Sequence, residues 1–154
     1  MLVNEIMTVS PSVLQPDQAV LEVHRILSME SYHHLPVVEA GILVGLISDR
    51  DLARTVSPFT GTELEQTRDL RQMMLRVRDI MSTDLVTIDG HTTIDYAAIL
   101  LLENQISCLP VVDDQFRLEG LLTWKDILHF YVYQSEDTSS ELYEDTLSHV
   151  NFEI

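Results

Sequence analysis

Cysteine is almost absent from this chain, and basic residues and long apolar runs are scarce. The single cysteine, Cys108, excludes an internal disulfide and suits a reducing compartment. Lysine and arginine total 9 against 25 aspartates and glutamates, which gives a formal net charge of -16. A surface this acidic repels nucleic acid and anionic membranes, so neither is expected as a partner.

The apolar segments are too short to span a bilayer. The longest surrounds residues 42–47, and the first residues show no basic stretch before an apolar run, as a signal peptide would. We therefore expect a cytoplasmic protein. The chain has 154 residues, which is enough for one compact domain or two small ones around a shared core.

What the chain does contain is an internal repeat. Three segments recur in the same order: 3–8 (VNEIMT) at 77–82 (VRDIMS), 35–39 (LPVVE) at 109–113 (LPVVD), and 45–48 (GLIS) at 120–123 (GLLT). The first two recur 74 positions further on and the third recurs 75 positions further on. The second copy therefore has one extra residue, which we place in a turn near Asp114 and Gln115.

Both copies predict the same order of elements, β-α-β-β-α, and thus an α+β fold. A short β segment comes first, at 12–14 and at 85–88. Two strands joined by a turn come later, at 36–38 and 42–47 and again at 110–112 and 116–122, and a second helix begins after Ser48 and after Thr123. Between them, apolar residues at spacings of three and four predict a helix: Ala19, Val20, Val23, Ile26 and Leu27 in the first copy, and Ile94, Ala97, Ala98, Leu101 and Leu102 in the second.

This pattern divides the chain into repeats at 1–55 and 77–133, a connector at 56–76 and an acidic tail at 134–154. Residues 64–76 favour a connecting helix with Arg68, Arg71 and Arg76, which we interpret as a solvated basic face rather than a phosphate site. A short helix is expected after Ser139 or Ser140 in the tail. Whether the tail docks or stays mobile is left open.

Both copies place a hydroxyl and a carboxylate three residues apart just before the second helix. These pairs are Ser48 with Asp51 and Thr123 with Asp126. Taken alone, each pair is the pattern of a helix cap. The start of a helix also binds anions, and a carboxylate facing the same cleft can accept two hydrogen bonds from a ribose diol. Because the pattern occurs twice within one repeat framework, we favour a functional role.

Together these segments resemble the cystathionine β-synthase (CBS) domain family, present as one tandem pair, the unit called a Bateman module. The resemblance covers residues 1–133 and is carried by 6–7, 35–38 and 45–52 with their counterparts 80–81, 109–112 and 120–127. It implies two repeats packed with pseudo-twofold symmetry and two clefts between them. It also implies a homodimer.

The resemblance further implies adenosine-containing ligands in the clefts, with AMP, ADP, ATP and S-adenosylmethionine as candidates and no required cofactor. It assigns ribose binding to Asp51 and Asp126. Phosphate binding falls to Ser48, Arg50, Thr123 and Lys125, the two cations adding positive charge in matching places. The adenine pocket is expected at Val13, His34, Leu35, Pro36, Thr87, Cys108, Leu109 and Pro110.

The two clefts are expected to differ. Trp124 stands where the first copy has Asp49, and Cys108 stands where the first copy has His34. The indole ring of Trp124 either walls the second cleft or covers the module surface. The different polarity of His34 and Cys108 makes unequal occupancy an expected result.

Other functions are less favoured. Adjacent histidines on a strand point to opposite sides, which disfavours a metal site built from His24, His33, His34 and Cys108. No nucleophile–base pair or glycine-rich phosphate loop indicates an enzyme. We expect a regulatory module that senses a ligand and acts on a separate protein in trans. The alternative is a dimerising protein-interaction module whose clefts are empty.

Overall fold

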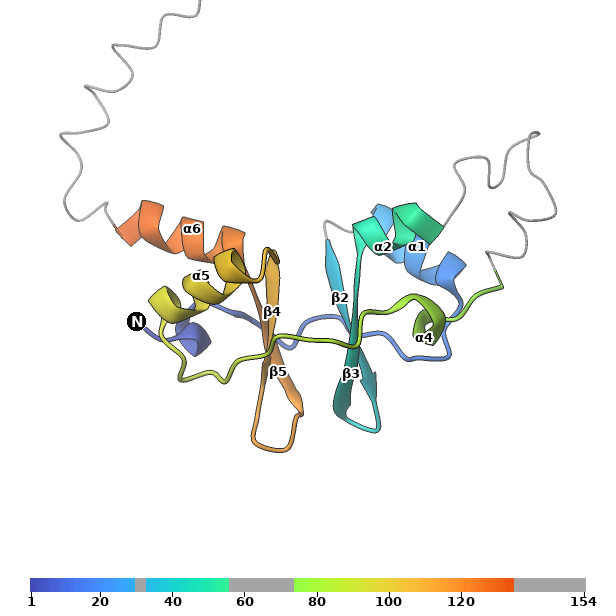
Figure 1. Ribbon diagram of the computed structural model, residues 1–154, viewed down its shortest axis with the longest axis horizontal. Helices are drawn as coiled ribbons and strands as arrows, with labels where there is room; N and C mark the ends of the chain where they lie inside the picture. The colour runs from blue at the N-terminus through green and yellow to red at the C-terminus, as the bar shows by residue number, and fades with distance from the viewer. Residues whose placement is uncertain (30–32, 56–73, 135–154) are drawn as a thin grey trace, which may run out of the picture.

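The computed structural model describes residues 1–29, 33–55 and 74–134 (Figure 1). The predicted acidic tail helix lies outside these residues, and so does most of the predicted connecting helix. The last residues predicted for that connecting helix, 74–76, are not helical.

From the long helix onward, the elements follow the predicted order in both repeats. The first repeat has a 3-10 helix η1 (Val3–Glu5), β1 (Thr8–Val9), α1 (Val20–Met29), β2 (His34–Glu39), β3 (Ile42–Ser48) and α2 (Asp49–Thr55). The second has α4 (Val77–Ile80), α5 (Ile94–Glu103), β4 (Cys108–Val112), β5 (Leu118–Thr123) and α6 (Trp124–Gln134). In Figure 1 the helices α1 and α2 lie beside one hairpin and α5 and α6 beside the other, as two similar halves.

The predicted first β segments are extended chain and not strands of a sheet. Leu14 makes one parallel bridge to Val37, and Ile88 makes the matching bridge to Val111. Leu14 donates its N–H to Pro36 O at 2.8 Å and accepts from Val38 N at 2.9 Å. Each segment therefore meets the neighbouring hairpin at a single residue, which is too short a pairing for a ladder.

The two hairpins differ in their turns. In the first, Ala40 and Gly41 connect β2 to β3 with positive φ angles of 50° and 84°, as a tight two-residue turn requires. In the second, Asp113 closes a longer loop and accepts from Gln115 N at 2.9 Å and from Arg117 N at 2.8 Å. The additional residue of the second repeat is in this loop, as predicted. The strand predicted from Phe116 begins later, at Leu118, because Phe116 has a left-handed φ of 62°.

The repeats exchange their first segments. The N-terminal segment of the first repeat binds the second, because Val3 N donates to Thr92 O at 2.9 Å and β1 pairs antiparallel with β5. The corresponding segment of the second repeat binds the first, where Val77 N donates to Gln18 O at 3.0 Å. Figure 1 shows η1 beneath α5 and α4 beside β3. The sheets are accordingly β1-β5-β4 and β2-β3.

Methionine and glycine make this exchange possible. Met7 lies over Gly120, where an added Cβ would be 2.6 Å from the methionine sulfur and 2.8 Å from the Thr8 carbonyl oxygen. Met81 lies over Gly45 in the same way, with its sulfur 2.5 Å from such a Cβ. The Ile-Met segment of each repeat therefore contacts the Gly-Leu segment of the other repeat.

Each half has its own apolar core. One is built around Val3, Leu109 and Leu122, and the other around Leu14, Val37 and Val77. Val3 and Val77 are fully buried, so each exchanged segment fills the core of the other repeat. Leu102 was predicted on the buried face of its helix, but it is 78% exposed. No helix among the described residues is long and apolar enough to span a membrane.

Candidate functional site

The Ser48–Asp51 pair is a helix cap in the structure. Ser48 ends β3 and α2 begins at the next residue. Asp51 Oδ2 accepts from both the backbone N and the Oγ of Ser48, each at 2.8 Å, and Asp51 N donates to Ser48 Oγ at 3.3 Å. These reciprocal bonds satisfy groups that a helix start leaves without partners, which explains the spacing of three.

The second repeat reproduces this geometry. Asp126 Oδ2 accepts from Thr123 N and Thr123 Oγ1, each at 2.7 Å, and Asp126 N donates to Thr123 Oγ1 at 3.4 Å. In both pairs the capping bonds use only Oδ2. Among the described residues nothing donates to the Oδ1 atom of Asp51 or Asp126, so each half-buried carboxylate keeps one oxygen for a further donor.

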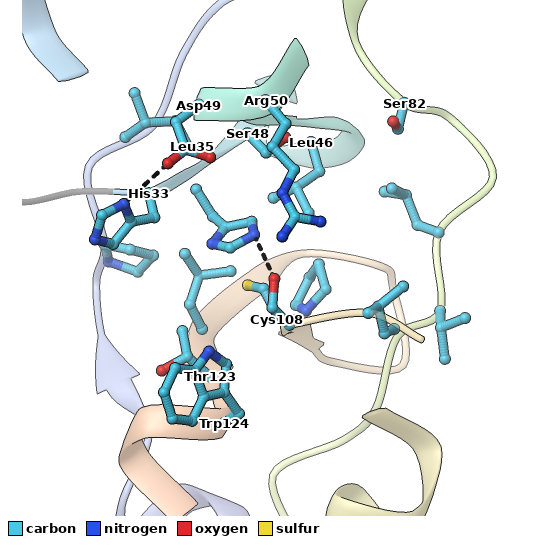
Figure 2. Close-up of a pocket in the computed structure, with 18 of the residues that line it drawn as sticks. His33, Leu35, Leu46, Ser48, Asp49, Arg50, Ser82, Cys108, Thr123 and Trp124 are labelled. Carbon is cyan, nitrogen blue, oxygen red and sulfur yellow. Dashed lines mark hydrogen bonds and ion pairs between the residues drawn. The ribbon is translucent and has the colours of Figure 1, made fainter. Parts of the chain in front are cut away.

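Both caps line the same pocket, a cavity of about 760 Å³ between the two repeats (Figure 2). The family resemblance implied two clefts, whereas both sets of residues line one cavity in the structure. The predicted residues in its wall are Ser48, Arg50, Asp51, His34, Leu35, Thr123, Lys125, Asp126, Cys108 and Pro110.

Four residues predicted for the adenine pocket do not line this cavity: Val13, Pro36, Thr87 and Leu109. Val13 is 44% exposed on the extended segment before β2. Leu109 is fully buried in a core because side chains alternate along β4, and its neighbours Cys108 and Pro110 face the cavity instead. Pro36 is buried and Thr87 half-buried, both away from the cavity wall.

The cavity wall also contains Trp124, which was expected either to wall the second cleft or to cover the surface, together with His33 and Asp49. His33 Nδ1 lies 3.1 Å from Asp49 Oδ2 at the mouth of the first half, and Trp124 takes the place of Asp49 in the second (Figure 2). Ser82 and Asp84 come from the exchanged segment of the second repeat. Only the exchange brings them to this wall, and nothing in the repeat pattern signals it.

A hydrogen bond between two side chains joins the repeats across the cavity. His34 Nε2 lies 3.1 Å from Ser107 Oγ, and both residues line the pocket. Burial lowers the pKa of His34 below its ordinary value of 6.5, so the ring is neutral near pH 7. Cys108 takes the matching place in the second repeat, and burial together with the charge of Asp126 raises the pKa of its thiol to about 12.

Two basic residues near the connector serve the fold instead of the pocket. Arg78 forms an ion pair with the Asp17 carboxylate, and Arg76 Nη1 donates to Asp17 O at 3.0 Å. Arg68 and Arg71 lie outside the described residues. No group of three or more histidine, cysteine or acidic side chains suited to a metal ion occurs in the described parts of the chain.

Comparison with known proteins identifies the family. The CBS domain model matches residues 3–58 and 77–133, which together make up most of the chain. The chain belongs to the CBS domain family. The CBS domain-containing protein YhcV of Bacillus subtilis is 30% identical over 149 residues, which are 97% of this chain and 96% of YhcV.

Two solved CBS structures show the same arrangement with ligands bound. The CBS domain pair of protein MJ0100, in complex with 5′-methylthioadenosine and S-adenosyl-L-methionine, has a TM-score of 0.70 and 28% identity and matches 87% of this chain and 98% of its own. CBSX2 in complex with AMP has a TM-score of 0.73 and 27% identity, again over 87% and 98%. These comparisons establish the fold as a tandem CBS pair.

Some relatives extend well beyond a single pair. The chain spans only 47% of protein MJ1225 of Methanocaldococcus jannaschii, to which it is 28% identical over 131 residues.

Proposed function

We propose that this CBS pair is a ligand-sensing regulatory module that binds an adenosine-containing ligand in the pocket between its repeats. The observation that carries the proposal is the pair of caps, Ser48–Asp51 and Thr123–Asp126, which lie in one cavity with one carboxylate oxygen free of described donors in each. A ribose diol supplies two hydroxyl donors, and a charged acceptor makes such bonds stronger than neutral ones.

The geometry refines the roles of the hydroxyls. The single proton of Ser48 Oγ is donated to Asp51 Oδ2, and Thr123 Oγ1 is engaged in the same way. Contact with a phosphate oxygen would require that proton to turn away from the carboxylate. Arg50 and Lys125, which line the cavity, therefore carry most of the proposed phosphate binding. The proposed base contacts are His34, Leu35, Cys108 and Pro110.

The ligand class rests on the relatives as well as on the cavity. CBSX2 is described with AMP, and the MJ0100 pair with S-adenosyl-L-methionine and 5′-methylthioadenosine. We infer AMP, ADP, ATP or S-adenosylmethionine as candidates here. We also infer that the module is not an enzyme, that it resides in the cytoplasm, and that it acts on a separate protein in trans.

Calorimetric titration with these compounds tests the proposal. Asp51→Asn and Asp126→Asn are the informative variants, because an amide oxygen still accepts the capping bonds while the free oxygen becomes an amide donor. Each variant should weaken binding to the half it belongs to by about 1–3 kcal/mol and leave the melting temperature nearly unchanged.

Asp79→Asn is the matched control. Asp79 Oδ2 accepts from Arg76 N at 2.8 Å, an equivalent capping bond at α4, and Asp79 does not line the cavity. Its affinity should equal that of the unaltered protein. If none of the compounds binds below millimolar concentration, or if Asp79→Asn weakens binding as much as Asp51→Asn, the proposal is wrong.

A second candidate function is a dimerising protein-interaction module, and the surface of the second repeat favours it. Large apolar side chains are exposed on both of its packed helices, Ile99 and Leu102 on α5 and Leu128 and Tyr131 on α6. The Tyr131 hydroxyl donates to Asp95 of α5, which joins the two rows into one surface. We infer that this surface binds a second copy of the chain, which is compatible with ligand binding in the cavity.

A further inference from the structure

The charged side chains of the pocket wall are unequal in number. Four carboxylates and two cations line it, so the aspartate, lysine and arginine side chains of the described wall sum to a formal net charge of -2. The whole chain is also strongly acidic, with a formal net charge of -16. These six side chains are Asp49, Asp51, Asp84 and Asp126, with Arg50 and Lys125.

The two halves differ in charge at the residue before each cation. In the first half Asp49 precedes Arg50, and its carboxylate is 53% exposed and bonded to His33 Nδ1 at 3.1 Å. In the second half the uncharged Trp124 precedes Lys125. Arg50 therefore lies in sequence between two carboxylates, Asp49 and Asp51, whereas Lys125 has only one adjacent acid, Asp126.

The pKa of His34 depends on the charges in the first half of the pocket. Burial is the main cause of the lowered pKa of His34. Among the charged groups, Asp49 has the largest effect and raises this pKa, while Arg50 lowers it by less. At the matching place in the second half, the charge that acts on Cys108 is Asp126. At both places a carboxylate is the leading charge.

We propose that the pocket selects adenosine ligands by charge, taking adenosine and AMP in preference to ADP and ATP, and that Asp49 sets this preference in the first half. This inference rests on the proposed function and narrows its ligand class.

The physical reason is that each half offers one cation, which can pair with a single phosphate group. Every additional phosphate brings further negative charge toward the carboxylates, with no further cation in the described wall to meet it. Like charges repel more strongly in a partly enclosed site than in water. Arg76 and Arg78 do not line this wall, and both are bonded to Asp17.

The test is calorimetric titration of the full chain with adenosine, AMP, ADP and magnesium-free ATP at low salt. AMP should bind about tenfold more tightly than ATP. Asp49→Asn retains the hydrogen-bond acceptor for His33 but removes the charge. This variant should bind ATP more tightly than the unaltered chain does, because a repelling charge is gone. The ratio of AMP to ATP affinity should therefore fall by about threefold or more.

The control is Asp114→Asn, which removes the same charge from an exposed turn outside the pocket and should leave the ratio of AMP to ATP affinity unchanged. ATP binding as tightly as AMP would overturn this inference and leave the proposed function standing. Equal effects of Asp49→Asn and Asp114→Asn would overturn the role of Asp49. If none of the four compounds binds, this inference fails. If S-adenosylmethionine does not bind either, the proposed function fails with it.

Discussion

At the scale of single residues, Asp51 and Asp126 show how capping and binding can share one carboxylate. The sequence presented these as competing interpretations, a helix cap or a ribose ligand. In the structure Oδ2 makes the cap and Oδ1 receives no bond from any described residue. The sequence could identify the residues, but the division between the two oxygens depends on the side-chain rotamer and so required coordinates.

His34 makes stability depend on pH. Burial holds the pKa of His34 below 6.5 in the native state. As the pH falls below 6.5, the imidazole is therefore protonated more readily in the unfolded chain than in the native state. The stability that comes from neutral His34 is complete above pH 6.5 and is lost as the pH falls through the lowered native pKa. Between about pH 7 and about pH 5, the free energy of unfolding of His34→Gln should therefore fall by less than that of the unaltered protein, as measured by urea titration.

Glutamine is chosen because its amide can still bond with Ser107. His91→Gln provides the comparison, since His91 is 85% exposed and lies outside the pocket. It should retain the pH dependence of the unaltered chain. An unchanged pH dependence in His34→Gln would show that the buried imidazole does not govern this transition.

At the scale of the elements, the repeat predicted the kinds of element well but not their partners. Apolar spacing located α1 and α5, and the glycine in the first turn located the β2–β3 hairpin. The two copies of the Ile-Met segment are too alike for either to reveal which repeat it binds. That β1 pairs with β5 is a long-range result of packing, which local propensity does not encode.

The two matched glycines, Gly45 and Gly120, differ in how much room they leave for an added side chain. At Gly120 an added Cβ would meet the Thr8 carbonyl oxygen at 2.8 Å, and backbone in a sheet cannot easily move. At Gly45 the nearest atoms all belong to the flexible Met81 side chain. Gly120→Ala should lower the free energy of unfolding by about 2–3 kcal/mol, and Gly45→Ala by clearly less, in urea titrations. Equal losses would contradict the docking of β1 described here.

At the scale of the whole molecule, the candidate site belongs to the pair and not to either repeat. Its wall combines Ser48 and Asp51 of one repeat with Thr123 and Asp126 of the other. The repeated hydroxyl–carboxylate pattern predicted correctly that these residues lie at helix starts. The prediction of two separate clefts came from the family resemblance. The cavity depends on how the two hairpins face each other, and no motif records that packing.

Self-association is the prediction for the outer surface. If α5 and α6 bind a second copy, Leu102→Gln with Leu128→Gln should shift the chain toward monomer in analytical ultracentrifugation. Both side chains are exposed, at 78% and 53%, so stability should change by only about 0.5 kcal/mol. Met74→Gln, at a site 79% exposed elsewhere, is the control. A monomeric unaltered chain, or a dimer insensitive to the double change, would contradict the prediction.

The central claim is that adenosine ligands bind between the repeats through the capping carboxylates. A crystal structure of the chain grown with AMP tests it most directly. We expect AMP in the shared cavity, with its ribose hydroxyls within hydrogen-bond distance of Oδ1 of Asp51 or Asp126. AMP bound elsewhere on the molecule, or in the cavity with its ribose turned away from both carboxylates, would contradict the account.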